Sequence, residues 1–280
     1  MPASIRRFRY LPLVLACYSP CSAWDTEPHQ MITRAALDAL PKSFLSRLGP
    51  EVEPLAALYC IYPDRYEEME RYGFVRKSPG PRSAAEIRVY CVHPDGHPVH
   101  GATGDREMDR DSLVYVLEGI IANLSQQRPS EAARYAGVLA HFIEDSLSPP
   151  HAVSPEELMD LTQRVAPGMR GNIHSAIEKS VPGFTLQKSA VHPISGTVQN
   201  IATTILDQCY AGAETNQEDL PAIVRAATGH DEPALNGYRL RAGKTAAQIL
   251  ANALYSIFDA RLTADDVDAE LFHLFGVVAA

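Results

Sequence analysis

Two pairs of side chains suited to metal binding lie in the middle of the sequence. His141 and Asp145 are four residues apart in a segment whose apolar residues recur at helical spacing, so both project from one face of the predicted helix. His174 and Glu178 repeat this spacing downstream. An imidazole and a carboxylate one turn apart offer nitrogen and oxygen ligands that suit zinc. One such pair alone is more often a hydrogen-bonded surface pair, but two together favour a metal site.

A third histidine follows the first pair where the chain must turn. Pro149 and Pro150 lack the amide hydrogen that a helix needs, so they end the helix that carries His141 and Asp145. We expect this turn to bring His151 back toward the same point, between the two pairs.

The segments that position these residues have the apolar periodicity of helices. Glu27 and Pro28 are typical of a helix start and place His29 in the first turn, where a histidine is more often a capping or surface residue. Ser154 and Pro155 mark the start of another helix. Further apolar stripes predict helices over residues 109–124, 156–165, 196–210 and 245–258.

One segment has a different pattern. Residues 87–100 contain a Pro-Asp-Gly sequence flanked by β-branched residues, which predicts a hairpin. His93 and His97 would lie at its exposed tip, whereas His100 would lie at its base, next to the helical body. The sequence as a whole predicts an all-α, single-domain fold with one short hairpin insertion.

Residues 1–23 have the pattern of a secretory signal peptide. Arg6, Arg7 and Arg9 precede a short apolar run, and small residues precede Trp24 at the expected cleavage point. This run is too short to span a bilayer, and no later stretch approaches the roughly 20 apolar residues of a transmembrane helix. We therefore expect a secreted or periplasmic protein with a mature domain at 24–280.

The cysteines of the predicted leader allow two interpretations of how the protein is exported. Cys17 and Cys21 lie in the predicted leader, and Cys17 ends a Val-Leu-Ala-Cys sequence that resembles a lipobox. The alternative to secretion is therefore lipid anchoring through Cys17. Because an exported protein meets oxidising conditions, we predict a disulfide between Cys60 and Cys91, with Cys209 a buried thiol.

The charge of the chain limits the classes of partner. The formal net charge is −9, and loss of the three arginines of the leader would make the mature protein more acidic still. Such a chain lacks the basic face with which proteins hold duplex DNA by its phosphates. A nuclease stays open, because bound zinc ions supply positive charge locally.

Taken in order, the candidate ligands resemble a known pattern. This order consists of a tryptophan freed by signal cleavage, a histidine soon after it, an aspartate, a histidine, and then His-x3-Asp-x5-His and His-x3-Glu. It resembles that of the zinc-dependent phospholipase C and single-strand-specific zinc nuclease superfamily. The matching positions extend from Trp24 to Glu178. The resemblance implies an all-helical protein that holds three zinc ions and hydrolyses phosphate esters with a metal-activated water.

The resemblance also implies which residues bind each ion. The ligands of the first zinc would be His29, a bridging Asp145 and Trp24 through its amino nitrogen and carbonyl oxygen. The ligands of the second zinc would be Asp145, His141, Asp64 and one further histidine. The ligands of the third zinc would be His151, His174 and Glu178. Asp64 would also orient or deprotonate the attacking water. Without the resemblance, Asp64 is equally typical of a helix N-cap.

The further histidine of the second zinc lies in an insertion relative to the family pattern. His100 is the first choice because it lies at the base of the predicted hairpin, His93 is the second, and His97 is the remaining candidate. The other histidines of the mature chain lie outside the pattern and are interpreted as ordinary surface or packing residues; they are His192, His230 and His273.

Features of the ligand pattern point to different substrates. Glu178 resembles the phospholipase C branch, whereas the short step from Trp24 to His29 and the long step from His151 to His174 resemble the nuclease branch. We expect a phospholipase C-like phosphodiesterase that acts on phospholipid with transient contact to a membrane surface. The alternative is an endonuclease that acts on single-stranded nucleic acid. An alternative of another class is a non-catalytic or lipid-anchored envelope protein on the same scaffold.

Overall fold

The computed structural model describes residues 26–73, 83–169 and 171–258, and every regular element within these ranges is a helix. The all-α prediction is therefore confirmed. The predicted signal peptide, with its lipobox, and Trp24 lie outside the described residues.

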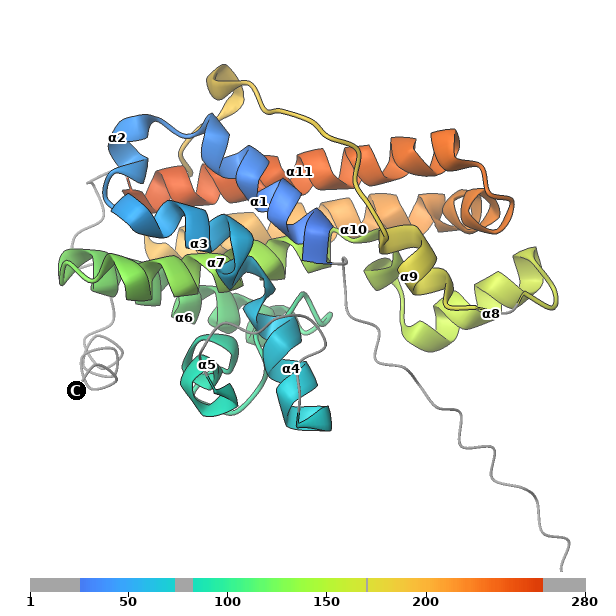
Figure 1. Cartoon of the computed structure of the whole chain (residues 1–280), viewed down its shortest axis with the longest axis horizontal. Coiled ribbons are helices and arrows are strands. Elements are labelled where there is room, and N and C mark those ends of the chain that lie inside the picture. The colour runs from blue at the N-terminus through green and yellow to red at the C-terminus, as the bar shows by residue number, and fades with distance from the viewer. Residues whose placement is uncertain (1–25, 74–82, 170, 259–280) are drawn as a thin grey trace, which may run out of the picture.

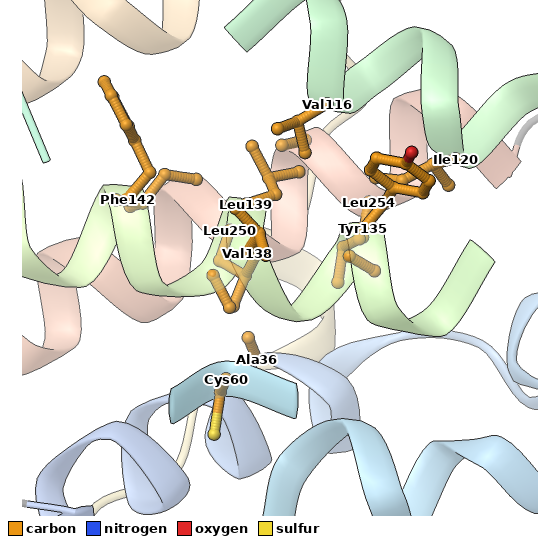
Figure 2. Close-up of a cluster of buried hydrophobic side chains, with 14 of the residues drawn as sticks. Ala36, Cys60, Val116, Ile120, Tyr135, Val138, Leu139, Phe142, Leu250 and Leu254 are labelled. Atoms are coloured by element: carbon orange, nitrogen blue, oxygen red, sulfur yellow. The ribbon is translucent and has the colours of Figure 1, made fainter. Parts of the chain in front are cut away.

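Helix α7 (Pro129–Ser146) runs through the middle of the molecule, and its residues are buried from Ala132 onward (Figure 1). It packs against α6 (Arg106–Ser125), α1 (Thr26–Ala39) and η2 (Tyr59–Ile61). Figure 2 shows apolar side chains of α7 meeting those of neighbouring helices. A helix surrounded in this way carries small or apolar residues at most positions, so each polar residue on it needs a partner.

Two long helices lie side by side along the molecule, α10 (Val198–Thr228) and α11 (Glu232–Phe258) (Figure 1). Near the turn that joins them, they pack with α8 (Pro155–Val165) and α9 (Ile173–Glu178) around a second, smaller apolar cluster. The short η3 (Pro149–Ala152) links α7 to this end of the molecule.

The predicted helices are found, and two of them are longer than expected. The segments 109–124 and 156–165 correspond to α6 and α8, and Ser154 caps α8 as predicted. The segments 196–210 and 245–258 are only parts of α10 and α11. The additional turns are more polar, and α10 contains Pro221, so their apolar periodicity is weak. Packing in the smaller cluster holds these turns in the helix.

The hairpin predicted over residues 87–100 is wrong in its first half. Ala84–Cys91 form α5, which begins with a capping box at Ser83 and buries residues at helical rather than alternating spacing. A turn follows, and its single antiparallel bridge, between Val92 and Pro98, is the only bridge in the described part of the chain.

The remaining helices are short. They are α2 (Lys42–Leu45), η1 (Gly49–Glu51), α3 (Val52–Ala57), α4 (Tyr62–Tyr72) and η4 (Lys188–Ala190). Helices α4 and α5 pack on each other below α7 in the view of Figure 1. Among the helices that the structure describes, none is long and apolar enough to cross a membrane.

The predicted Cys60–Cys91 disulfide is wrong, because all three cysteines within the described ranges are free and buried. The Sγ atom of Cys60 lies 3.3 Å from the carbonyl oxygen of Ala56, to which its thiol donates, and Figure 2 places Cys60 in the core beside α7. Burial raises the pKa of Cys60 and of Cys91 well above the usual value, so both are protonated packing residues. The prediction of Cys209 as a buried thiol is confirmed.

Candidate metal centre

Eight of the nine predicted ligands lie together near the C-terminal end of α7; the ninth, Trp24, lies outside the described residues. They form three groups of ligand atoms, and within each group these atoms lie within 4.8 Å of one another. The groups are His29, His141 and Asp145; Asp64, His100 and His141; and His151, His174 and Glu178.

Local sequence explains how the helices present these residues. In α7 the four-residue spacing puts His141 and Asp145 on one face, with Nε2 and Oδ2 3.1 Å apart. Asn172 caps α9 by accepting a hydrogen bond from the backbone N–H of Ser175, and this starts the single turn that carries His174.

A loop brings His100 to α7. The next residue, Gly101, approaches α7 so closely that a Cβ on it would lie 3.0 Å from the Cβ of Asp145. The backbone N–H of Ala102 donates to Oγ of Ser146 at 2.8 Å, which fixes the loop on the helix. A side chain at this position would press on Asp145, so the lack of one at Gly101 helps His100 to reach the cluster.

Asp145 lies at the centre of the first two groups and is completely buried. Its Oδ2 lies 2.9 Å from Nε2 of His100 and 3.1 Å from Nε2 of His141, and its Oδ1 lies 3.4 Å from Nε2 of His29. Burial alone would raise the pKa of Asp145, but the neighbouring His141 and His100 hold it well below the usual value. An ionised carboxylate in this position is suited to bridging two cations.

Asp64 faces the same point from the first turn of α4. Its Oδ1 lies 3.6 Å from Nε2 of His100 and 3.8 Å from Nε2 of His141. The N-cap of α4 is Ile61, so Asp64 does not occupy the N-cap position. Burial raises the pKa of Asp64 to about 6, against the opposing effect of the two histidines.

The third group is held between η3 and α9. Nδ1 of His174 lies 2.6 Å from Oε2 of Glu178, and Nε2 of His151 lies 3.4 Å from Oε1 of Glu178. Ser148 donates to Oε1 of Glu178. Buried Arg239 of α11 donates to the carbonyl oxygens of Ile177 and Ala176 at 2.6 Å each, and so holds the end of α9 in place.

Buried atoms of this cluster lack hydrogen-bond partners among the described residues. They are Nε2 of His29, Oδ1 of Asp64, both carboxylate oxygens of Asp145, Nδ1 of His174 and Oε2 of Glu178. Several lie close together, but not in line for a hydrogen bond. Buried polar atoms without partners are rare because their desolvation is costly, and cations bound within the ligand groups would satisfy these atoms. The mixed nitrogen and oxygen ligand set fits zinc or a related divalent metal.

Most of the histidines suit metal binding in their protonation. Burial lowers the pKa of His29 well below its usual value and that of His174 to about 4, so both are neutral at pH 7, as a ligand must be. His100 differs: burial lowers its pKa, but the adjacent Asp145 outweighs this and raises it to about 9. Burial raises the pKa of Glu178 well above its usual value, against the opposing effects of His151 and of the hydrogen bond from Ser148.

Further residues form hydrogen bonds with the ligand histidines, and the predicted ligand pattern does not include them. Oε2 of Glu144 lies 2.6 Å from Nδ1 of His29, and Thr33 donates to Oε1 of Glu144 at 2.7 Å. The carbonyl oxygen of Cys60 lies 2.8 Å from Nδ1 of His141. The signals in the sequence were a second acid directly before Asp145 and a threonine one turn after His29.

The cluster is open to solvent at one edge. The side chains of His100 and His151 are 23% and 25% exposed, whereas those of His29, His141 and Asp145 are fully buried. This edge borders a cleft of about 400 Å³ between α4, α5 and the turn that follows α5. A ligand therefore reaches the cluster from the side of His100 and His151.

The other histidines lie elsewhere. The rings of His93 and His97 stack on each other 4.4 Å apart, and His97 bonds to Ser112 rather than to the cluster. His192 and His230 are exposed, as expected for surface residues, and His273 lies outside the described residues. Of the three candidates near residue 100, the structure thus brings His100 into the cluster.

Comparison of the chain with protein-family models, with curated proteins and with solved structures finds no match.

Proposed function

We propose that this protein is a zinc-dependent hydrolase of phosphoric esters, of the phospholipase C type. The observation that carries the proposal is the convergence of three ligand groups on buried polar atoms that have no hydrogen-bond partner in the described residues. The resemblance of the ligand order to the zinc phospholipase C and nuclease superfamily supports the same chemistry. Bound zinc ions would lower the pKa of a bound water to about 7 and stabilise charge on phosphorus.

In this proposal the side chains have different roles. The three groups would hold the ions, and Asp145 would be shared between the first two. Asp64 lies at the edge of the cluster beside the partly exposed His100, with its Oδ1 3.6 Å from Nε2 of that histidine. We infer that Asp64 orients the attacking water and takes its proton. The substrate phosphate would enter at the edge formed by His100 and His151.

The second candidate is a nuclease for single-stranded nucleic acid. The short step from Trp24 to His29 and the long step from His151 to His174 support it. The cleft beside the cluster does not, because its Arg71 and Arg88 are paired with Glu67 and Glu70 of the same cleft. Glu178 in the third group favours the phospholipase instead. A non-catalytic protein on the same scaffold is the least supported, since it would lack a ligand near residue 100, where His100 completes a group.

The test is to measure zinc content and hydrolysis with the same purified protein. We expect bound zinc by elemental analysis and chelator-sensitive cleavage of a phosphocholine ester. Cleavage of single-stranded DNA or RNA alone would assign the nuclease function instead. Absence of zinc and of both activities in protein that starts at Trp24 would refute the proposal, and a mature chain with lipidated Cys17 would remove the amine expected to bind the first ion.

A further inference from the structure

Glu144 is a completely buried carboxylate that belongs to none of the three ligand groups. It lies on α7 directly before Asp145, and both of its oxygens contact α1. Oε2 lies 2.6 Å from Nδ1 of His29, and Oε1 accepts a hydrogen bond from Oγ1 of Thr33 at 2.7 Å. Thr33 lies one turn after His29 and is also fully buried, so the three side chains form one connected unit between α1 and α7.

This contact distinguishes the two nitrogens of His29. Nδ1 is held by Glu144, whereas Nε2 faces Oδ1 of Asp145 at 3.4 Å and has no hydrogen-bond partner among the described residues. A histidine ligand must present a bare nitrogen to the metal and carry its proton on the other. A carboxylate that accepts the Nδ1–H bond sets this tautomer and also fixes the plane of the ring.

His141 offers a comparison within the same cluster. Its Nδ1 lies 2.8 Å from the carbonyl oxygen of Cys60, and its ring stacks on that of His29 with 4.3 Å between centroids. Both rings thus turn Nε2 toward Asp145. His141 is oriented by the backbone, whereas His29 is oriented by a side chain that can be replaced.

We propose that Glu144, itself held by Thr33, is a positioning residue that fixes the ring of His29 with Nε2 toward the ligand group of Asp145. This inference rests on the metal function proposed above. It assigns Glu144 no contact with substrate.

The experiment uses the full-length protein and compares Glu144→Gln and Thr33→Val with the wild type. Zinc affinity is measured by competition with a chelator. We expect Glu144→Gln to weaken binding at one site by about 10- to 100-fold and to leave the other sites unchanged. Thr33→Val keeps the size of the side chain but removes the hydroxyl, and we expect a smaller loss at the same site. Glu118→Gln is the matched control, because Glu118 is equally buried on α6 but belongs to no ligand group.

A second measurement reports on the ring itself. Nitrogen-15 NMR of the histidine rings distinguishes a protonated from a bare nitrogen. In the metal-free wild type we expect His29 to carry its proton on Nδ1. In Glu144→Gln we expect the two tautomers to mix, since an amide can either donate to Nδ1 or accept from it. A purely structural role for Glu144 would lower stability without changing this pattern.

The outcomes separate the two proposals. Zinc binding by the wild type together with unchanged zinc affinity and tautomer in Glu144→Gln would overturn the positioning role alone. Lack of zinc binding by the wild type would overturn the metal function and, with it, this inference. Should Glu144→Gln not fold, Thr33→Val decides: wild-type affinity in that variant contradicts the proposal, and a loss at one site supports it.

Discussion

At the scale of single residues, Asp145 is the side chain on which the cluster depends most. Its oxygens lie within 3.4 Å of ring nitrogens of His29, His100 and His141, and neither oxygen has a hydrogen-bond partner in the described residues. Asp145→Asn keeps the shape but removes the charge that two cations would share. We expect this variant to lose the metal of the first two groups and to keep that of the third, as measured by elemental analysis.

Asp109→Asn is the control for this change. Asp109 is buried as well, but its carboxylate accepts hydrogen bonds from Thr103 and from the hydroxyl of Tyr210, so its role is structural. We expect Asp109→Asn to lower the free energy of unfolding by about 1–3 kcal/mol and to keep the full metal content. Equal metal loss in both variants would mean that Asp145 acts only through stability.

At the scale of elements, the contact between α7 and η2 decides how precisely the ligands are placed. A Cβ on Gly137 would lie 2.4 Å from the carbonyl carbon of Tyr59, so η2 must shift if this residue becomes alanine. Since η2 carries the carbonyl oxygen of Cys60 that meets His141, the shift also disturbs a ligand. We expect Gly137→Ala to lower the free energy of unfolding by about 1–3 kcal/mol in chemical denaturation and to weaken zinc binding.

Gly237 provides a matched comparison in another helix. It lies in α11, and a Cβ there would have no atom within 4 Å. Inside a helix, alanine is more favourable than glycine by about 0.5–1 kcal/mol. We therefore expect Gly237→Ala to leave the free energy of unfolding unchanged or to raise it. If both glycine variants behave alike, the close approach of α7 and η2 does not limit stability.

At the scale of the whole molecule, the ligands come from parts of the chain that are far apart in sequence. They come from α1, α4, the loop before α6, α7, η3 and α9, and so link the main core to the smaller apolar cluster. Metal binding should therefore stabilise the entire fold.

Removal of metal tests this coupling. A single site at 100 times its dissociation constant contributes about 2.7 kcal/mol, and 1 kcal/mol shifts the Tm of a domain of this size by about 2–4 °C. We expect a chelator to lower the Tm by at least about 5 °C and zinc to restore it. The Tm of Asp145→Asn should fall less than that of the wild type when chelator is added. A Tm that is insensitive to chelator in the wild type would contradict the coupling.

Features that depend on local spacing follow from the sequence alone. The helical period put His141 with Asp145 and His174 with Glu178 on shared faces, and proline and capping residues marked where α7 ends and α8 begins. These features follow from the geometry of one helix and need no knowledge of distant residues. The all-α fold class and most helices were predictable for the same reason.

Features that depend on residues far apart in the chain follow from how the helices pack. The predicted hairpin favoured His100 over His93 and His97, but that hairpin is wrong in its first half. The close approach of Gly101 to α7, which places His100 in the cluster, is in no local pattern. Likewise, the partner of His29 is Glu144, 115 residues away, and the burial of Cys60 and Cys91 as free thiols is a result of packing that their positions in the sequence do not reveal. Local spacing thus predicted which side chains are candidate ligands, whereas long-range packing decided which of these side chains lie together. Contact between distant residues is set by how the helices pack rather than by the sequence of each helix alone.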